Sequence, residues 1–174
     1  HDYISFGQAC MTLEESPSRE NPREHLYMDL HHLSHVAWKE NRVRVIDHVH
    51  AKDTMTPWQM CQDFGHSNLA EPVKRAIEKE PNKQVSIRRI VMSAHEYDYL
   101  TPRAKAAKGK KDRKLPFCVV YVDADNCKVL REGGLKQLPY VIPRWHRLNR
   151  TPYAFSPAAM TALPDARMLQ MLAR

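Results

Sequence analysis

Apolar and polar residues alternate along residues 42–50, and this alternation is the clearest pattern in the chain. Three valines alternate with basic residues there: Val43, Val45 and Val49 on one side, and Arg44, His48 and His50 on the other. A period of two with β-branched residues predicts a half-buried strand. The apolar positions of residues 26–38 predict extended structure as well, so the polar turn at 39–41 predicts a hairpin.

Two short helices are predicted after this hairpin. Thr56 is placed to cap the first helix, Pro57 suits its first position, and Gln59 completes a capping box. The predicted buried face recurs every three residues, at Trp58, Cys61 and Phe64. Gly65 predicts the end of this helix. The second helix begins near residues 68–71, with a predicted buried face of Leu69, Val73 and Ile77 and with exposed ion pairs of Glu71 with Arg75 and Lys74 with Glu78.

Most of the remaining segments are predicted as strands. These strands are 4–13, 85–91, the extended segment 140–145, and a hairpin of 117–122 with 127–130. Gly133 and Gly134 predict a break, while Pro139 and Pro143 confine the segment between them to a sheet edge or a bulge. A last helix is predicted from Ser156. Strands, two short helices, strands and a helix in this order predict an α+β fold of mostly antiparallel strands.

Length and composition are those of an ordinary soluble globular domain. The chain has 174 residues, which is enough for a sizeable core. We expect residues 1–157 to form one α+β domain and residues 158–174 to begin a truncated helix. The N-terminus has neither an initiator Met nor a signal pattern, so we expect an excised piece of a longer protein. No apolar stretch approaches the ~20 residues that span a bilayer.

The excess positive charge lies in one segment. The net charge of the chain is +7, and residues 102–114 alone carry +6. The cations of this segment are Arg103, Lys105, Lys108, Lys110, Lys111, Arg113 and Lys114. No aromatic residue is interleaved, so these side chains are candidates for salt-dependent contacts with DNA phosphates that do not read the bases. The favoured interpretation of this segment is nevertheless a disordered, solvated loop, with DNA contact as the alternative.

Histidine and aspartate patterns favour structural interpretations. His48 and His50 lie on the polar side of one predicted strand, but no third ligand follows at a metal-site spacing, so hydrogen-bonded or solvated histidines are favoured. Asp123 and Asp125 are paired carboxylates in a predicted turn, where Asp is common because it makes local hydrogen bonds. Arg144 and Arg147 flank Trp145, which favours structural arginines beside a packed indole over phosphate binding.

Catalytic and cofactor motifs are missing from the sequence. It contains no G-x-S-x-G, Walker or G-x-G-x-x-G pattern, and only five glycines in all, so we predict no enzyme, no cofactor and no metal. We interpret the four cysteines as buried free thiols of a reducing, cytoplasmic environment: Cys10, Cys61, Cys118 and Cys127. The alternative is that Cys118 faces Cys127 across the second hairpin.

The order of several segments resembles the head-to-tail connector, or portal, proteins of short-tailed bacteriophages. Residues 140–145, Tyr-Val-Ile-Pro-Arg-Trp, resemble the family's PF-x-V-x-RW strand. Ser-Pro at 156–157 and Ala-Leu-Pro-Asp at 162–165 resemble its SP…ALPD helix start. Residues 153–157 keep the Tyr, Ser and Pro of the YGRSP element, with Ala and Phe in place of its Gly and Arg. Weaker likenesses of the same kind are Phe6-Gly7, residues 46–69, Ile90-Val91 and residues 129–134.

The resemblance implies a structural role. Such proteins form closed rings of identical subunits, usually dodecamers, at one capsid vertex. The ring seeds head assembly, docks the packaging terminase, passes double-stranded DNA and holds the tail. The resemblance implies no catalytic residues and no membrane, and it implies a virion component assembled in the bacterial host cytoplasm. It also implies that this chain is the wing region of a subunit, cut within a helix whose Met168, Met171 and Leu172 need a partner.

An alternative function is a stand-alone basic module that binds nucleic acid through residues 102–114. Its affinity would depend steeply on salt and would collapse when four lysines of the segment become glutamate: Lys105, Lys108, Lys110 and Lys111. Association into a ring would instead favour the portal resemblance.

Overall fold

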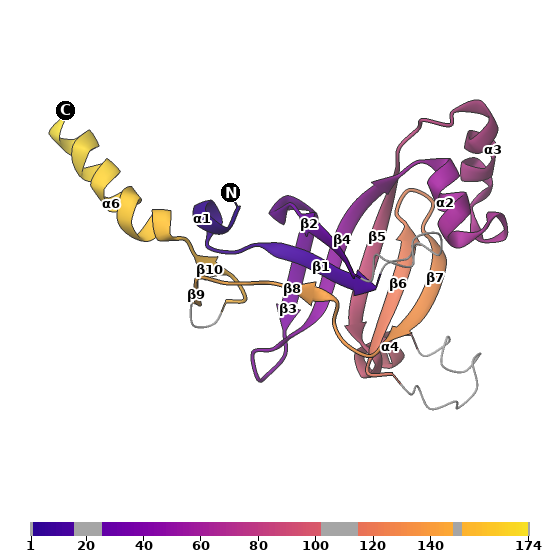
Figure 1. The fold of residues 1–174 in the computed structure, drawn as a ribbon, viewed down its shortest axis with the longest axis horizontal. Helices are drawn as coiled ribbons and strands as arrows, with labels where there is room; N and C mark the ends of the chain where they lie inside the picture. Colours follow the sequence, from indigo (N-terminus) through magenta and orange to yellow (C-terminus); the bar gives the residue numbers. More distant parts are fainter. Residues whose placement is uncertain (1, 16–25, 102–114, 148–150, 174) are drawn as a thin grey trace. The chain divides into compact units, whose positions relative to one another are not determined.

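A computed structural model describes residues 2–15, 26–101, 115–147 and 151–173 (Figure 1). The chain divides into two compact units. The first unit takes residues 1–36, 42–44 and 139–174, and the second takes residues 37–41 and 45–138. Mixed helices and antiparallel sheets confirm the predicted α+β class.

The second unit is built on a five-stranded sheet in the order β3-β4-β5-β6-β7. Its strands are β3 (Val36–Glu40), β4 (Ile46–Met55), β5 (Val85–Ser93), β6 (Phe117–Asp123) and β7 (Lys128–Leu135). The pairs from β4 to β7 are antiparallel and follow one another along the chain. Strands β3 and β4 are hydrogen-bonded neighbours, as are β6 and β7, so both predicted hairpins are confirmed.

The first hairpin turns later than its alternation predicts. Residues 42–45 form the turn, where the Asn41 amide donates to the Val45 carbonyl at 2.9 Å and the Val45 amide to Asn41 Oδ1 at 3.0 Å. Val43 and Val45 are exposed and do not join the buried side of the strand, because β4 starts only at Ile46. Val49 is fully buried, as the alternation predicts.

Helices α2 (Pro57–Phe64) and α3 (Glu71–Lys79), joined by η2 (His66–Asn68), cover one face of this sheet. The predicted capping box at Thr56 and Gln59 is present, and Gly65 ends α2 with a φ of +80°. The shared core consists of Met60, Phe64, Leu69, Ala70, Val73, Val85, Ile87 and Leu130. The buried face of α2 thus follows Met60 and Phe64, and the prediction for Trp58 is wrong, because its side chain is 57% exposed.

The ion pairs predicted on α3 are both wrong. Among the described residues, Glu71 pairs with Lys74 Nζ at 2.7 Å and not with Arg75, so Lys74 does not pair with Glu78. This contact holds the pKa of the Glu71 carboxyl below its usual range. The predicted buried positions Leu69 and Val73 are confirmed.

A short helix that the sequence pattern did not predict, α4 (Ala94–Leu100), packs on the opposite face of the sheet. Ser93 caps it by accepting a hydrogen bond from the Glu96 amide at 3.2 Å. Tyr97 is buried against Met92, Cys118 and Val120. Its hydroxyl donates to Glu132 Oε1 at 2.6 Å, and burial together with this carboxylate raises the pKa of Tyr97 to about 12.

The β6–β7 hairpin excludes the alternative for the cysteines and corrects the expectation for the glycines. Cys118 lies opposite Gly134 in the register, so it does not face Cys127; all four cysteines are free thiols, but Cys127 is exposed and not buried. Gly133 and Gly134 do not break the chain but lie within β7. Gly134 fits there because an added Cβ would come within 2.7 Å of Leu115 Cδ1.

The first unit contains a three-stranded sheet in the order β2-β1-β8. Its strands are β1 (Cys10–Glu15), β2 (Leu26–His31) and β8 (Tyr140–Val141), and β8 confirms the predicted edge segment. A 3-10 turn, η1 (Leu33–His35), follows β2, and β9 (His146–Arg147) pairs with β10 (Ala154–Phe155). Residues 2–6 form helix α1 (Asp2–Phe6), so the strand predicted over 4–13 starts only at Cys10.

The last helix, α6 (Pro157–Leu172), starts where the sequence predicts. Ser156 Oγ accepts a hydrogen bond from the Ala159 amide at 2.8 Å, and Pro157 occupies the first turn. Helix α1 contacts α6. None of the described helices is both long and apolar enough to cross a membrane.

Candidate functional site

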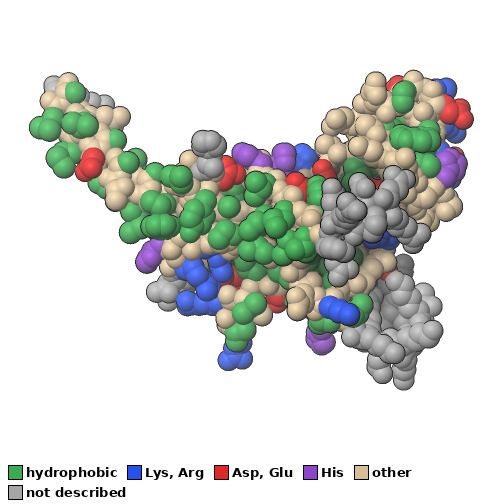
Figure 2. All heavy atoms as spheres, in the orientation of Figure 1, with side chains coloured by type: hydrophobic (Ala, Val, Ile, Leu, Met, Phe, Trp, Pro, Cys, Tyr) green, Lys and Arg blue, Asp and Glu red, His purple; other side chains and the backbone are tan. Residues whose placement is uncertain are grey.

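The three-stranded sheet of the first unit exposes one apolar face, which we call the apolar sheet face. Six residues of three strands form it: Met11, Leu13, Leu26, Met28, Leu30 and Val141. They share a face because cross-strand partners and every second residue point the same way. Leu26, Met28 and Leu30 are 61%, 65% and 78% exposed. Figure 2 shows hydrophobic side chains gathered over β1 and β2.

The other face of the same sheet is buried at its centre, around Thr12, although Tyr27 at its end is 50% exposed. Cys10, Thr12 and Tyr140 are at most 6% exposed, and Thr12 hydrogen-bonds His31 of the neighbouring strand. Burial raises the pKa of the Cys10 thiol to about 11, so this thiol stays protonated and unreactive near neutral pH. The two faces of the sheet therefore differ: one packs against the rest of the unit at its centre, and the apolar sheet face is exposed.

Helix α6 is a second exposed apolar surface in the same unit. None of its residues is buried, although it carries Met160, Leu163, Met168, Leu169, Met171 and Leu172. These side chains are distributed around the helix and do not form one stripe, a pattern typical of helices that are surrounded by other elements. The predicted need of Met168, Met171 and Leu172 for a partner is consistent with their exposure of 58–78%.

A tight backbone joint leads from β8 to α6. The Trp145 amide donates to the Gly7 carbonyl at 2.7 Å, and the Ala154 amide donates to Gln8 Oε1 at 2.9 Å. Gly7 has a φ of +72°, and an added Cβ would come within 2.1 Å of the Phe155 carbonyl oxygen. Only glycine fits at this crossing, which lies directly before the Ser156 cap of α6.

Arg144 and Arg147 act within the joint, as the structural interpretation predicts. Arg144 Nη1 donates to the Pro152 carbonyl at 3.0 Å, and Arg147 Nη2 donates to the Arg44 carbonyl at 3.0 Å. Trp145 contacts Tyr3 edge-to-face, with ring centroids 6.1 Å apart. The indole is nevertheless 58% exposed, so it is not the packed core residue that the sequence predicts.

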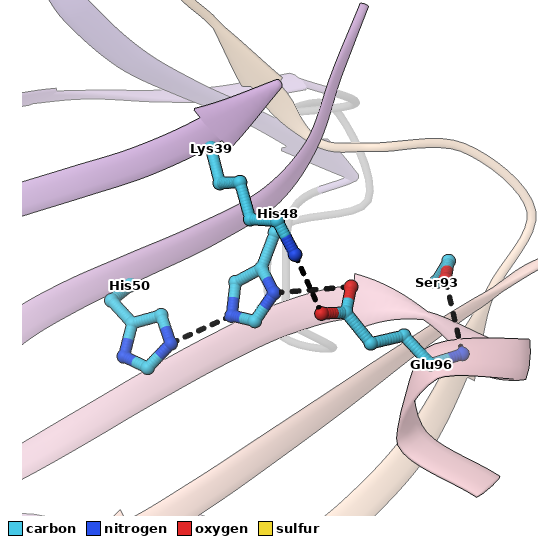
Figure 3. A network of polar contacts seen from close by, with 5 residues as sticks. All are labelled: Lys39, His48, His50, Ser93 and Glu96. Atoms are coloured by element: carbon cyan, nitrogen blue, oxygen red, sulfur yellow. Dashed lines mark hydrogen bonds and ion pairs between the residues drawn. The ribbon is translucent and has the colours of Figure 1, made fainter. Parts of the chain in front are cut away.

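A polar cluster in the second unit ties α4 to the sheet (Figure 3). Lys39 Nζ donates to Glu96 Oε1 at 2.9 Å, and His48 Nδ1 lies 3.4 Å from Glu96 Oε2. The rings of His48 and His50 stack with centroids 4.7 Å apart, and their Nε2 atoms are 2.7 Å apart. One of these two nitrogens must donate and the other accept, so the pair is a hydrogen bond only while one ring is neutral.

Charges around the cluster shift two pKa values downward. Burial, His48 and Arg88 lower the pKa of His50, and the hydrogen bond from Lys39 lowers that of Glu96. In the part of the chain that the structure describes, no group of three side chains suited to a metal is present. The contacts of His48 with Glu96 and with His50 agree with the favoured interpretation of hydrogen-bonded histidines.

Acidification is expected to destabilise the second unit through His50. The pKa of His50 is lower in the folded than in the unfolded state. The contribution of His50 to the free energy of unfolding is therefore complete above pH 6.5, and it is lost as the pH falls through the folded-state pKa. Urea unfolding should show that the free energy of unfolding of the unchanged protein decreases between pH 7.5 and pH 5.5, and that His50→Gln makes this decrease smaller. An equal decrease in the unchanged protein and in His50→Gln would contradict this expectation.

The predicted DNA-contacting residues of 102–114, from Arg103 to Lys114, lie outside the described residues. Asp123 and Asp125 have the predicted turn role. Asp123, which is fully buried, accepts hydrogen bonds from the Asp125 amide, the Asn126 amide and Asn126 Nδ2 at 2.8–3.1 Å. The apolar sheet face was not predicted, although the alternation of Leu26, Met28 and Leu30 with other residues indicates a strand with two different faces.

Two exposed apolar surfaces on one small unit are features of a component of a larger assembly. The family model described as bacteriophage head to tail connecting protein matches residues 1–174, and the chain belongs to this family. It is 32% identical over 122 residues to the portal protein of Salmonella phage epsilon15, a match covering 68% of this chain and 20% of the relative. The probable portal protein of Bordetella phage BPP-1 is 31% identical over 119 residues, covering 67% and 20%. The chain thus spans about a fifth of the length of these relatives.

Proposed function

We propose that this chain is part of a subunit of a phage portal ring, through which DNA is packaged and ejected. The match of the family model to all of residues 1–174 carries the proposal. Portal proteins of two phages, each about 30% identical to this chain, support it. Helix α6 supports it further, because a ring subunit needs apolar surfaces that meet the rest of the assembly.

The proposed partners follow from this role. They are further copies of the same subunit in a closed dodecameric ring, capsid and tail proteins, the packaging terminase and double-stranded DNA. The ring would be a virion component at a capsid vertex, assembled in the host cytoplasm, with a structural and not a catalytic role. Within this proposal, residues 102–114 contact DNA phosphates through charge alone, because they carry +6 without interleaved aromatic residues.

The alternative function, a stand-alone module that binds nucleic acid, has less support. It accounts for the basic segment but for neither the family match nor the exposed apolar surfaces. Membership of the connector family therefore favours the ring.

Light scattering of the 174-residue chain beside the full-length subunit tests the proposal. We expect the short chain to be monomeric and the full-length subunit to form one large closed ring. If the full-length subunit stays monomeric, and the short chain binds DNA with a steep salt dependence, the stand-alone module becomes the better account.

A further inference from the structure

We propose that the apolar sheet face is covered by a segment of the same subunit that lies outside residues 1–174. This inference rests on the proposed function in one respect: that the chain is part of a longer portal subunit. The apolar sheet face is then an internal surface of the complete subunit and not a contact between subunits.

The register of the sheet makes this surface continuous. Met11 lies opposite Leu30 on one side and Val141 on the other, and Leu13 lies opposite Met28. Apolar residues are therefore neighbours across three strands around Met11 and Leu13, and at the end of the face Leu26 has Glu15 as its register partner. The residues between them, among them Thr12 and Asp29, point to the other face.

The outer edge of the sheet, formed by β2, is a second reason to expect a covering segment. Strand β2 is the outermost strand, so in the described chain its six residues are paired on the β1 side only. An apolar edge strand of this length is a site of unwanted pairing between chains unless another element covers it. The apolar sheet face and this edge lie together on β2, so one covering segment protects both.

The size of the surface argues for a tethered occupant. A specific interface between separate proteins uses about 20–30 residues on each side, whereas the apolar sheet face has six. A segment of the same chain meets the surface at an effective concentration on the order of millimolar, so a small surface is enough to hold it. The matched relatives have enough further sequence for such a segment, because about four fifths of their length lies outside the match.

The chemistry of the surface defines its occupant. Leu and Met make up five of the six side chains, and Met adapts to irregular shapes. The matching segment is therefore amphipathic, with leucine- or methionine-like side chains toward β1 and β2 and polar residues toward solvent.

Photo-crosslinking of the full-length subunit tests the inference directly. The photo-reactive residue benzoylphenylalanine is incorporated in place of Leu30, which is 78% exposed and tolerates a bulky side chain in this chain. After irradiation, we expect a product with the mass of one subunit, in which the peptide of position 30 is linked to a peptide from outside 1–174. The same residue in place of Ser34, an exposed position in η1, is the matched control and should not give this link.

Three results would overturn the inference. A product with the mass of two subunits would place a second copy on the face, and a link to a peptide within 1–174 would place part of this chain there. Position 30 linking no more than position 34 would show that the face is open to solvent. The product mass is read on denaturing gels whether or not the subunit forms a ring. Failure of the ring proposal in light scattering is thus a separate result.

A stability measurement supplements the crosslink. In the full-length subunit, Leu30→Glu should lower the midpoint of thermal unfolding by several degrees, because the covering segment would then bury a charge. Ser34→Glu should leave the midpoint unchanged. Equal midpoints for the two variants would contradict the inference.

Discussion

Gly7→Ala is expected to destabilise the first unit by about 3 kcal/mol, the upper end of the usual range for one substitution. Its φ of +72° disfavours any side chain. This conformational effect alone costs about 1 kcal/mol. The larger part of the loss comes from steric overlap.

The overlap involves backbone atoms, which cannot rotate away as the end of a flexible side chain can. An alanine Cβ would lie 2.1 Å from the Phe155 carbonyl oxygen and 2.7 Å from the Ser156 Cα. These atoms belong to β10 and to the cap of α6, so relief of the clash must shift the start of that helix. The hydrogen bond from the Trp145 amide to the Gly7 carbonyl would be strained by the same shift.

Hydrogen exchange read peptide by peptide measures this effect. We expect amides of residues 139–147 and 154–160 to lose protection in Gly7→Ala, and α2 to keep it. Gly65→Ala is the matched control, because Gly65 has a similar φ of +80° but nothing lies within 4 Å of the added Cβ. That control should lose about 1 kcal/mol, the conformational part alone. Equal losses at both glycines would show that the crossing at Gly7 relaxes without cost.

Local signals in the sequence account for the parts of the fold that were predicted correctly. The capping box at Thr56, the positive φ at Gly65 and the Ser156 cap involve residues within a few positions of each other. The two hairpins have the same local character, since each turn joins neighbouring strands. Interactions of this kind are visible in the sequence because they do not depend on the rest of the fold.

Contacts distant in sequence account for the errors. Gly133 and Gly134 continue β7 because Val119 and Leu115 occupy the space beside them, and this packing has no local signature. Trp58 is exposed because the sheet selects the side of α2 that carries Met60 and Phe64. Similarly, α4 is only seven residues long and depends on the sheet and on the contacts of Glu96.

The candidate site was predictable only in part. The exposed apolar helix after Ser156 follows from the sequence, because its methionines and leucines surround the helix axis. The apolar sheet face does not, because alternation along β2 shows that the two faces differ but not which one is buried. The register of β1 with β2 and β8 resolves this, since it places Thr12 and Tyr140 on the buried side.

Asp123→Ala is the second substitution with a large expected effect, a loss of about 3 kcal/mol of stability in the second unit. Hydrogen bonds to a charged group contribute about 1.5–3 kcal/mol, and buried donors left without acceptors cost about 1–3 kcal/mol. Asp123 accepts three such bonds and is fully buried at the end of β6. These bonds hold the turn in which Cys127 has a φ of +51°.

Urea unfolding at pH 7.5 measures this loss against Asp125→Ala. Asp125 is an exposed carboxylate two residues away, and it accepts one hydrogen bond, from the Ser86 amide at 3.2 Å. Water can replace that acceptor, so we expect a loss of about 1 kcal/mol or less. Asp123→Asn should fall between the two, because it keeps a carbonyl acceptor but loses the charge. If Asp123→Ala and Asp125→Ala cost the same, the turn would be held by its backbone alone, and the buried carboxylate would have no structural role of its own.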